Sequence, residues 1–245
     1  MTILRLRNFP PARVALGATG HSLPTREVLA FQLAHARARD AVHTALDTHE
    51  LAREIADCIV IRSAAPDRAT YLRRPDLGRR LAPESLSLLT PHTASFDVAF
   101  ILADGLSAQA VQRHAPHVLK LTLQSLNTAD WTIAPTVIAT QGRVAIGDEI
   151  GQALGANLAV VLIGERPGLS SPDSLGIYLT WHPRPGRTDA ERNCISNIHA
   201  DGLSYPAAVQ KLLFLMTEAR RRRLSGIGLR EESHVSANHN IGTIP

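Results

Sequence analysis

The stretch from Thr136 to Ser196 constrains the fold of this chain more than any other part of the sequence. It contains three apolar runs rich in β-branched residues, at Thr136–Thr140, Leu158–Ile163 and Leu175–Trp181, with a helical pattern at Ile146–Leu154 between the first two. Continuous apolar runs joined by helices are typical of parallel strands that are buried on both faces of a sheet. The stretch therefore predicts an α/β fold built on parallel strands.

The rest of the chain extends this plan. A long helix is predicted over residues 25–46, and we expect its apolar stripe to face a core. Further elements are predicted as strands at Cys58–Ile61 and Phe96–Ala103 and as helices at 107–124 and Tyr205–Arg223. We expect a Rossmann-like, mostly parallel sheet flanked by helices, with a smaller N-terminal region. The predicted division is 1–95, mainly helical, then 96–230, an α/β domain, then 231–245, a flexible C-terminal tail.

Two polar, Gly-bearing turns follow the first two runs of the central stretch. They are Gln141-Gly142-Arg143 and Gly164-Glu165-Arg166-Pro167-Gly168. In parallel sheets, ligands bind in the crevice beyond the carboxyl ends of the strands. We therefore expect a ligand to be held by residues of these turns, namely Arg143, Val144, Glu165 and Arg166. A structural ion pair between Glu165 and Arg166 explains the second turn equally well.

Composition excludes several classes of protein. The formal net charge of +4 is carried almost entirely by arginine, but the aromatic residues are sparse and lack the interleaving of RNA-binding modules. The two cysteines, Cys58 and Cys194, lie far apart and outside any CxxC pattern, which argues against a zinc site or a disulfide framework. No apolar run approaches the roughly 20 residues that cross a bilayer, and no signal-peptide core is seen at the N-terminus. We expect a cytoplasmic protein.

Two further motifs leave alternatives open. Asp104-Gly105-Leu106-Ser107 leads from a predicted strand into a helix N-terminus, where a phosphate or amide oxygen could bind, although the spacing of a phosphate-binding loop is missing. Asp104 could equally be a cap of that helix. Cys194 is most simply a buried thiol, but with His199 as a base it could be a nucleophile. That reading describes a stand-alone Rossmann-like small-molecule enzyme, and a depressed thiol pKa would favour it.

Several passages of the chain, in order and at matching spacing, resemble the small subunit of the ethanolamine ammonia-lyase family. The resemblance runs from about residue 11 to residue 229 and is most specific in its GERPGL and CISNIH strings. The matching passages are Ser22–Thr25, Tyr71–Leu81, Asp104–Ser107, Gly142–Val144 with Ile150-Gly151, Gly164–Leu169 and Arg192–His199.

This resemblance implies a hetero-oligomeric enzyme. The family pairs the small subunit with a large (β/α)₈ barrel subunit, binds adenosylcobalamin at their interface, and converts ethanolamine to acetaldehyde and ammonia by a radical route. The partner would bind ethanolamine and carry most catalytic groups, so no catalytic or metal-ligating residue is expected in this chain. No nucleic-acid or membrane partner is expected. The resemblance leaves open whether the enzyme is free in the cytoplasm or lies in a bacterial microcompartment.

The resemblance also implies which residues meet the cofactor. Residues 96–230 would form the cobalamin-binding domain, and Val144, Glu165 and Cys194 would contact the cobalamin. Arg143 and Arg166 lie beside them and are expected as further contacts. The chain has no Asp-x-His-x-x-Gly stretch, the pattern by which some cobalamin proteins replace the lower base with histidine. We therefore expect the dimethylbenzimidazole of the cofactor to stay on cobalt.

Overall fold

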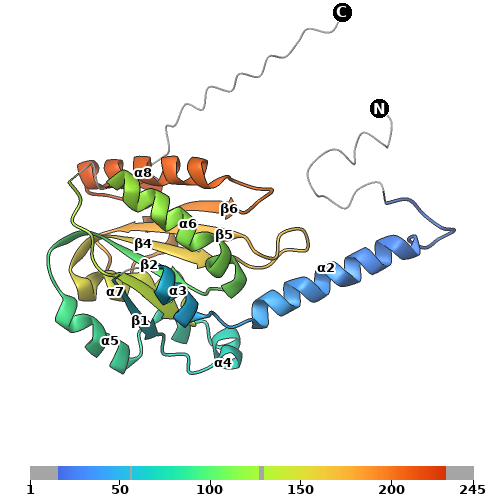
Figure 1. The fold of residues 1–245 in the computed structure, drawn as a ribbon, viewed down its shortest axis with the longest axis horizontal. Helices are drawn as coiled ribbons and strands as arrows, with labels where there is room; N and C mark the ends of the chain where they lie inside the picture. Colours follow the sequence, from blue (N-terminus) through green and yellow to red (C-terminus); the bar gives the residue numbers. More distant parts are fainter. Residues whose placement is uncertain (1–15, 56, 127–129, 230–245) are drawn as a thin grey trace, which may run out of the picture.

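The computed structural model describes residues 16–55, 57–126 and 130–229, and these form one mixed sheet between two layers of helices (Figure 1). The order of the six strands across the sheet is β1-β3-β2-β4-β5-β6. Their bounds are β1 (Cys58–Arg62), β2 (Phe96–Ala103), β3 (Thr136–Thr140), β4 (Ala156–Gly164), β5 (Leu175–Trp181) and β6 (Arg192–Ile198). The expected α/β class, with a mostly parallel sheet flanked by helices, is confirmed.

The direction of β5 corrects one expectation. Strands β1, β3, β2 and β4 are parallel, but β5 runs antiparallel to β4, and β6 runs antiparallel to β5. A parallel connection needs a crossover of about a dozen residues, usually with a helix, whereas antiparallel strands can be joined directly. The described segment between β4 and β5 is short and contains no helix, so the chain turns back on itself.

Strand β6 was not anticipated from the sequence. The predicted capping box of Thr188 and Glu191 is present, but it opens only a single 3-10 turn at Asp189–Glu191, after which the chain continues as β6. Along β6 only Ile195 and Ile198 supply buried apolar side chains, because this strand lies at the edge of the sheet. An edge strand of mixed polarity lacks the continuous apolar signal that marks a central strand.

The two helix layers cover different parts of the sheet. Helices α6 (Ala108–Leu126) and α8 (Tyr205–Arg222), with α3 (Thr48–Glu54), cover one face. On the other face α7 (Ile146–Leu154) packs on β2 and β4, and α5 (Pro83–Leu89) packs on β1. Beyond α7, on the same face, Tyr178 of β5 is half-buried and Cys194 of β6 is exposed.

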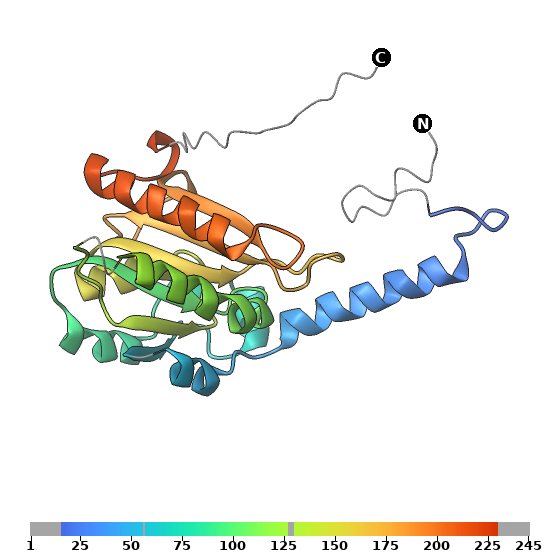
Figure 2. The ribbon, with the colours of Figure 1, turned by 45° about the horizontal axis from the view of Figure 1, so that its top comes forward.

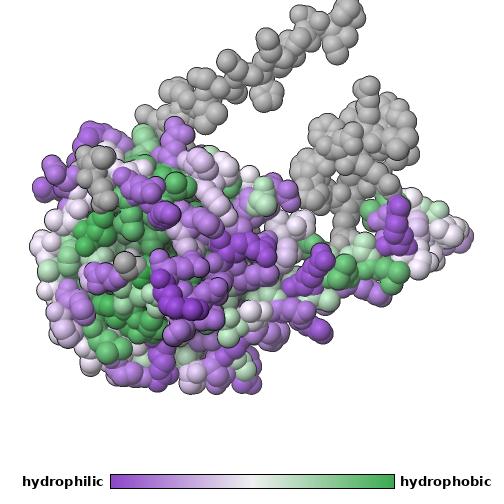
Figure 3. Space-filling model, in the orientation of Figure 1, coloured by the Kyte–Doolittle hydropathy of each residue, from purple (hydrophilic) through white to green (hydrophobic). Residues whose placement is uncertain are grey.

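Helix α2 (Thr25–His43) does not pack as the sequence suggested. It projects from the body of the molecule as an arm (Figures 1 and 2), and Ala41, near its C-terminal end, is its one buried residue. Hydrophobic residues lie on the surface of this arm (Figure 3). The expectation that its apolar stripe faces the core of this chain is wrong. The spacing of apolar residues can predict an apolar helix face, but it does not show what that face packs against.

The N-terminal region contributes to the sheet. Strand β1 precedes the predicted boundary at residue 95 and pairs with β3 along its whole length. Helix α4 (Arg68–Arg73) and a 3-10 turn at Leu77–Arg79 follow β1 and return the chain to the same edge of the sheet. The predicted tail, 231–245, lies outside the described residues. Within the described ranges, none of the helices combines the length and the apolar character needed to cross a membrane.

Candidate functional site

A pocket of about 420 Å³ lies at the carboxyl ends of the parallel strands. Its walls come from the loops that follow β2, β3 and β4, from α4 and from β5. This is the place where an open α/β sheet holds a ligand. The lining residues are Tyr71, Gly105, Leu106, Arg143, Val144, Ile163, Gly164, Glu165, Arg166 and Tyr178.

Two glycines let the loops after β2 and β4 touch at the base of this pocket. Gly105 has a φ of +57°, and a Cβ atom built there would lie 2.2 Å from the carbonyl oxygen of Gly164. The same carbonyl accepts a hydrogen bond of 2.9 Å from the Leu106 N–H. Only glycine combines a positive φ with such an approach of another backbone. The base of the pocket is therefore rigid backbone rather than side chain.

Asp104 holds the β2 loop to the β3 loop. Its buried carboxylate accepts hydrogen bonds of 2.9 Å from the N–H groups of Gln141 and Gly142. Ser107 accepts a hydrogen bond from the Ala110 N–H at 3.3 Å and donates one to a loop carbonyl. Both polar side chains of the Asp104–Ser107 motif thus form hydrogen bonds within the chain, and the motif holds neighbouring loops together.

Tyr71, a residue of α4, forms one side of the pocket. The Arg143 guanidinium lies 4.3 Å from the centre of the Tyr71 ring and that of Arg68 lies 4.7 Å from it, both within cation–π range. The Tyr71 hydroxyl donates to the Gly142 carbonyl at 3.2 Å, and the Arg143 N–H donates to the Gly78 carbonyl at 2.7 Å. Burial raises the pKa of Tyr71, so the phenol stays protonated.

Glu165 bends back over β5. One of its carboxylate oxygens, Oε2, accepts hydrogen bonds from the Ser174 hydroxyl and, at 3.3 Å, from the Asn197 N–H. The other, Oε1, lies so close to Gly176 that a Cβ atom there would be 2.9 Å away. No ion pair joins Glu165 to Arg166 in the described structure, so the structural ion pair considered above is not formed. The carboxylate is thus held in place through Oε2.

Cys194 lies beside the pocket rather than in its lining. It is the cross-strand neighbour of Tyr178, which does line the pocket. Loss of surrounding water raises the pKa of the Cys194 thiol, and the negative charge of Glu165 raises it further, although the Tyr178 side chain opposes both effects. The thiol therefore stays protonated at neutral pH, which is the opposite of an activated nucleophile.

His199 has other partners than Cys194. Its Nε2 atom lies 2.8 Å from the Asn197 Oδ1 and 3.2 Å from the Ser171 hydroxyl, and its Nδ1 accepts from the Asp201 N–H at 3.3 Å. A nucleophile and its base should lie within hydrogen-bonding reach of each other. With the raised thiol pKa, this geometry does not support a stand-alone enzyme that uses Cys194 as nucleophile.

Comparison with known proteins identifies the family. A family model described as "Ethanolamine ammonia-lyase light chain" matches residues 2–230. The chain is 54% identical to the ethanolamine ammonia-lyase small subunit of Azotobacter vinelandii, over 98% of this chain and 92% of the relative. It is 53% identical to that of Pseudomonas putida (98% and 91%) and 52% identical to that of Pseudomonas fluorescens (95% and 87%). The chain belongs to the ethanolamine ammonia-lyase small-subunit family. The resemblance seen in the sequence is thereby confirmed.

Four of the five residues proposed for cofactor contact line one pocket. They are Arg143, Val144, Glu165 and Arg166. The fifth, Cys194, adjoins the pocket through Tyr178. Sequence reasoning missed Tyr71 and Tyr178, since they reach the pocket from elements whose positions depend on the tertiary fold. Leu106, which also lines the pocket, belongs to the Asp104–Ser107 motif that the sequence offered as a possible ligand site.

The arginine-rich segment 73–80 lies next to this pocket. Arg79 lines a neighbouring groove of about 450 Å³ together with Arg143 and Val144. Arg74 instead pairs with Asp76 at 2.7 Å on the surface. In the described ranges, no cluster of three or more His, Cys, Asp or Glu side chains could hold a metal ion.

Proposed function

We propose that this chain is the small subunit of an ethanolamine ammonia-lyase, that it supplies one half of an adenosylcobalamin site, and that a large (β/α)₈ subunit supplies the other half. The observation that carries the proposal is the convergence of Arg143, Val144, Glu165 and Arg166 on one pocket with Cys194 at its margin. The names of the relatives, which specify a small subunit, support the existence of a large partner.

The residues present fit a corrin, which is a broad, largely apolar ring with amide arms. Apolar contact would come from Val144 and Leu106, which line the pocket. Glu165 Oε1 would accept a hydrogen bond from an amide arm, since Oε2 is already engaged. The Nε atom of Arg143 is buried and has no hydrogen-bond partner in the described structure, so it is a donor that a bound group would satisfy.

The pocket is too small to enclose such a ligand alone. Its volume of about 420 Å³ falls near the lower end of the range for drug-sized ligands, and a corrin with its side arms is larger. Beside it, Tyr178 of β5 is half-buried and Cys194 of β6 is exposed. This shape supports a half-site whose cover comes from another polypeptide.

Bound adenosylcobalamin would supply the radical chemistry that converts ethanolamine to acetaldehyde and ammonia. The residues of this chain would bind and orient the cofactor and exclude water from one side of it. Tyr71 and Cys194, both protonated because their pKa values are raised, would present neutral groups near the ring. Ethanolamine would be bound mainly by the partner. Cytoplasmic residence, free or in a microcompartment, stays a prediction.

Reconstitution tests this function. We expect neither polypeptide alone to release ammonia from ethanolamine, because each carries only part of the site, and we expect the mixture with adenosylcobalamin to do so. The measurement is ammonia release by the small subunit, the large subunit and their mixture, each with and without the cofactor. Ammonia release by the small subunit alone would refute this division of roles, and release by the large subunit alone would show that the half-site is not needed.

Replacing Glu165 by alanine should weaken cobalamin binding to the reconstituted enzyme about 30-fold. A hydrogen bond to a charged group contributes roughly 1.5–3 kcal/mol, and the substitution removes the free acceptor Oε1. The measurement is a cobalamin titration followed by absorbance.

Glu165→Gln is the matched control, since it keeps an acceptor at this position, and its loss should be smaller. Both variants should keep the native unfolding midpoint within a few degrees, because Glu165 lies on a loop. Wild-type affinity in Glu165→Ala would show that this carboxylate does not meet the cofactor.

A further inference from the structure

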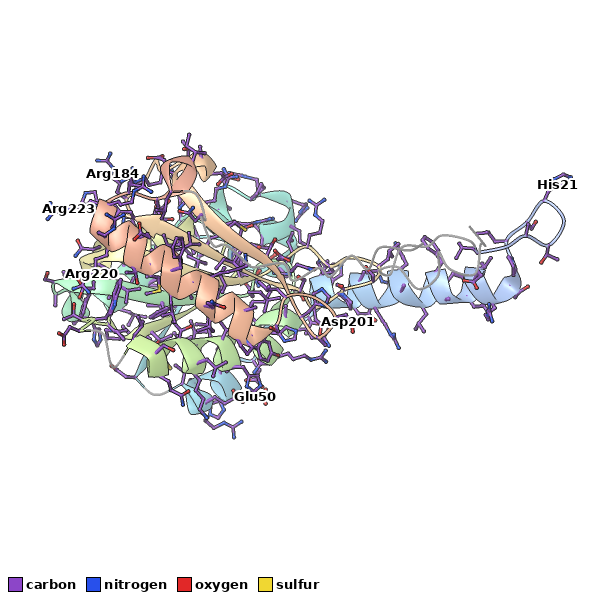
Figure 4. All side chains as sticks on the ribbon, turned by 90° about the horizontal axis from the view of Figure 1, so that it is seen from above. His21, Glu50, Arg184, Asp201, Arg220 and Arg223 are labelled. Atoms are coloured by element: carbon purple, nitrogen blue, oxygen red, sulfur yellow. The ribbon has the colours of Figure 1, made fainter. Side chains whose placement is uncertain are left out.

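We propose that His199 is a positioning residue for Glu165, the carboxylate expected to meet the cofactor. This inference rests on the proposed function, since it concerns how that carboxylate is held in the same site. His199 follows β6, is 8% exposed and is not among the residues that line the candidate pocket. Asp201 marks the turn after β6, at the end of the body away from Arg184 and Arg223 (Figure 4). In this proposal His199 acts on a bound cofactor through its neighbours.

The neighbours of His199 define which of its ring nitrogens carries the hydrogen. The Asp201 N–H can only donate, and it lies 3.3 Å from Nδ1, so Nδ1 is the acceptor. In a neutral imidazole the other nitrogen, Nε2, then bears the hydrogen. Nε2 lies 2.8 Å from the Asn197 Oδ1 and 3.2 Å from the Ser171 hydroxyl oxygen. His199 therefore donates to the Asn197 amide oxygen, and Nε2 is not free to act as a base toward Ser171.

Asn197 adopts a backbone conformation that needs support. Its φ of +65° lies in the left-handed region, which asparagine enters more readily than most residues but which is still disfavoured. Its side chain accepts the hydrogen bond from His199, and its carbonyl accepts one of 2.7 Å from the Leu203 N–H. A Cβ atom on Gly202 would lie 2.2 Å from the Asn197 carbonyl oxygen and 2.6 Å from His199 Nε2, so only glycine permits this packing. His199 is thus part of the packing that sets the conformation of Asn197.

The backbone of Asn197 connects His199 with Glu165. Its N–H donates to Oε2 of Glu165 at 3.3 Å. Because φ is the rotation about the N–Cα bond of Asn197, a change of this angle moves the N–H relative to the side chain that His199 holds. The second donor to Oε2, the Ser174 hydroxyl, belongs to the same β4–β5 segment as Glu165. The contact from Asn197 therefore ties the carboxylate to β6.

His199 also contacts the segment that carries Glu165. The Ser171 hydroxyl lies within hydrogen-bonding distance of Nε2, and the Ser171 carbonyl accepts a hydrogen bond of 3.0 Å from the Gly168 N–H. The turn after β6 and the β4–β5 segment are thus joined through one buried imidazole. A carboxylate that is already held in its binding geometry loses less conformational freedom when a ligand arrives. We expect His199 to raise the cofactor affinity in this way.

A double-mutant cycle on the reconstituted enzyme tests this inference. We expect His199→Ala to weaken cobalamin binding about fivefold, which is the effect of losing one ordinary hydrogen bond. In a Glu165→Ala background the same substitution should change the affinity by less than about twofold, because the group that it positions is gone. A residue that only maintains the fold would lower the affinity by the same factor in both backgrounds. The measurement is a cobalamin titration of each small-subunit variant in the presence of the large subunit.

Further variants keep the test independent of any one substitution. Asn197→Ala removes the acceptor and disfavours the positive φ, and since Asn197 is exposed the variant should fold and should repeat the loss and its dependence on Glu165. His199→Gln is the rescue variant, because its amide nitrogen can donate to Asn197, and its affinity should stay within about twofold of wild type. His92→Ala removes an exposed histidine elsewhere on the chain and should bind cobalamin as wild type does. Urea unfolding of each variant checks that it is folded.

The outcomes separate this inference from the function on which it rests. If the mixture of wild-type subunits does not bind cobalamin, the proposed function fails and the inference fails with it. If the mixture binds and Glu165→Ala weakens binding, but His199→Ala and Asn197→Ala do not, only the inference is overturned. Equal losses in both backgrounds would also overturn it, since His199 would then act independently of Glu165. A loss that disappears in the Glu165→Ala background, with rescue by His199→Gln, would support it.

Discussion

Replacing Arg192 by alanine is expected to lower the free energy of unfolding by about 3–5 kcal/mol. The guanidinium donates two hydrogen bonds of 2.7 Å to the carboxylate of Asp148 and one of 2.9 Å to the hydroxyl of Thr180. Asp148 is 2% exposed and Arg192 is 8% exposed. The substitution would therefore leave the buried carboxylate of Asp148 without its ion-pair partner. Burial already raises the pKa of this carboxyl group. Urea denaturation of the chain at pH 7 measures the loss.

Asp189→Ala provides the control for this prediction. Asp189 also approaches Arg192, at 3.6 Å, but its side chain is 99% exposed, and exposed pairs contribute at most about 1 kcal/mol. A loss below about 1 kcal/mol in Arg192→Ala would contradict this prediction. The Arg192–Asp148 ion pair matters for the site because Asp148 belongs to α7, close in sequence to Val144, while Arg192 begins β6, which carries Cys194. The ion pair fixes the two sides of the proposed cofactor site relative to each other.

The second large effect is a pH dependence set by Asp104. Burial raises the pKa of this carboxyl from 3.8 to about 6, against the opposing effect of its hydrogen bonds from Gln141 and Gly142. Between pH 4 and pH 6 the folded chain then keeps a proton that the unfolded chain has lost. The stabilisation by this group is complete below about pH 4 and is lost as the pH rises through 6. From this shift we expect a loss of about 3 kcal/mol at most.

Asp104→Asn isolates this contribution, since the amide does not titrate. The measurement is the free energy of unfolding of wild type and variant at pH 4, 5, 6 and 7. Other groups titrate in both proteins and cancel in the difference. We expect the stability of the wild type, relative to that of the variant, to fall across this range. A relative rise would mean that the hydrogen bonds to the carboxylate outweigh its burial.

The central strands could be predicted from the sequence because they are buried on both faces. The bounds expected for β2, β3 and β5, and for α7, agree with the structure, since each apolar run ends where burial ends. The antiparallel orientation of β5 could not be predicted in this way, because an apolar run does not show whether a strand is parallel or antiparallel to its neighbour. Helix α2 shows a second limit, since the spacing of its apolar residues does not show what they pack against.

The candidate site was predictable where it depends on strand ends. Arg143 and Glu165 follow β3 and β4 in the sequence, and parallel strands bring such positions to one edge. Tyr178 and Cys194 become neighbours only through the antiparallel β5–β6 pair, and β6 had no clear signal. Tyr71 reaches the pocket through its contacts with Arg143 and Gly142, which depend on the tertiary fold.

The central claim is that the cofactor-binding site is divided between two polypeptides, and a cobalamin titration tests this claim most directly. Cobalamin should be titrated into the small subunit, the large subunit and an equimolar mixture, with binding followed by equilibrium dialysis. The account predicts that the mixture binds at least about 100-fold more tightly than either polypeptide alone. Equal affinity of the large subunit alone and of the mixture would contradict it.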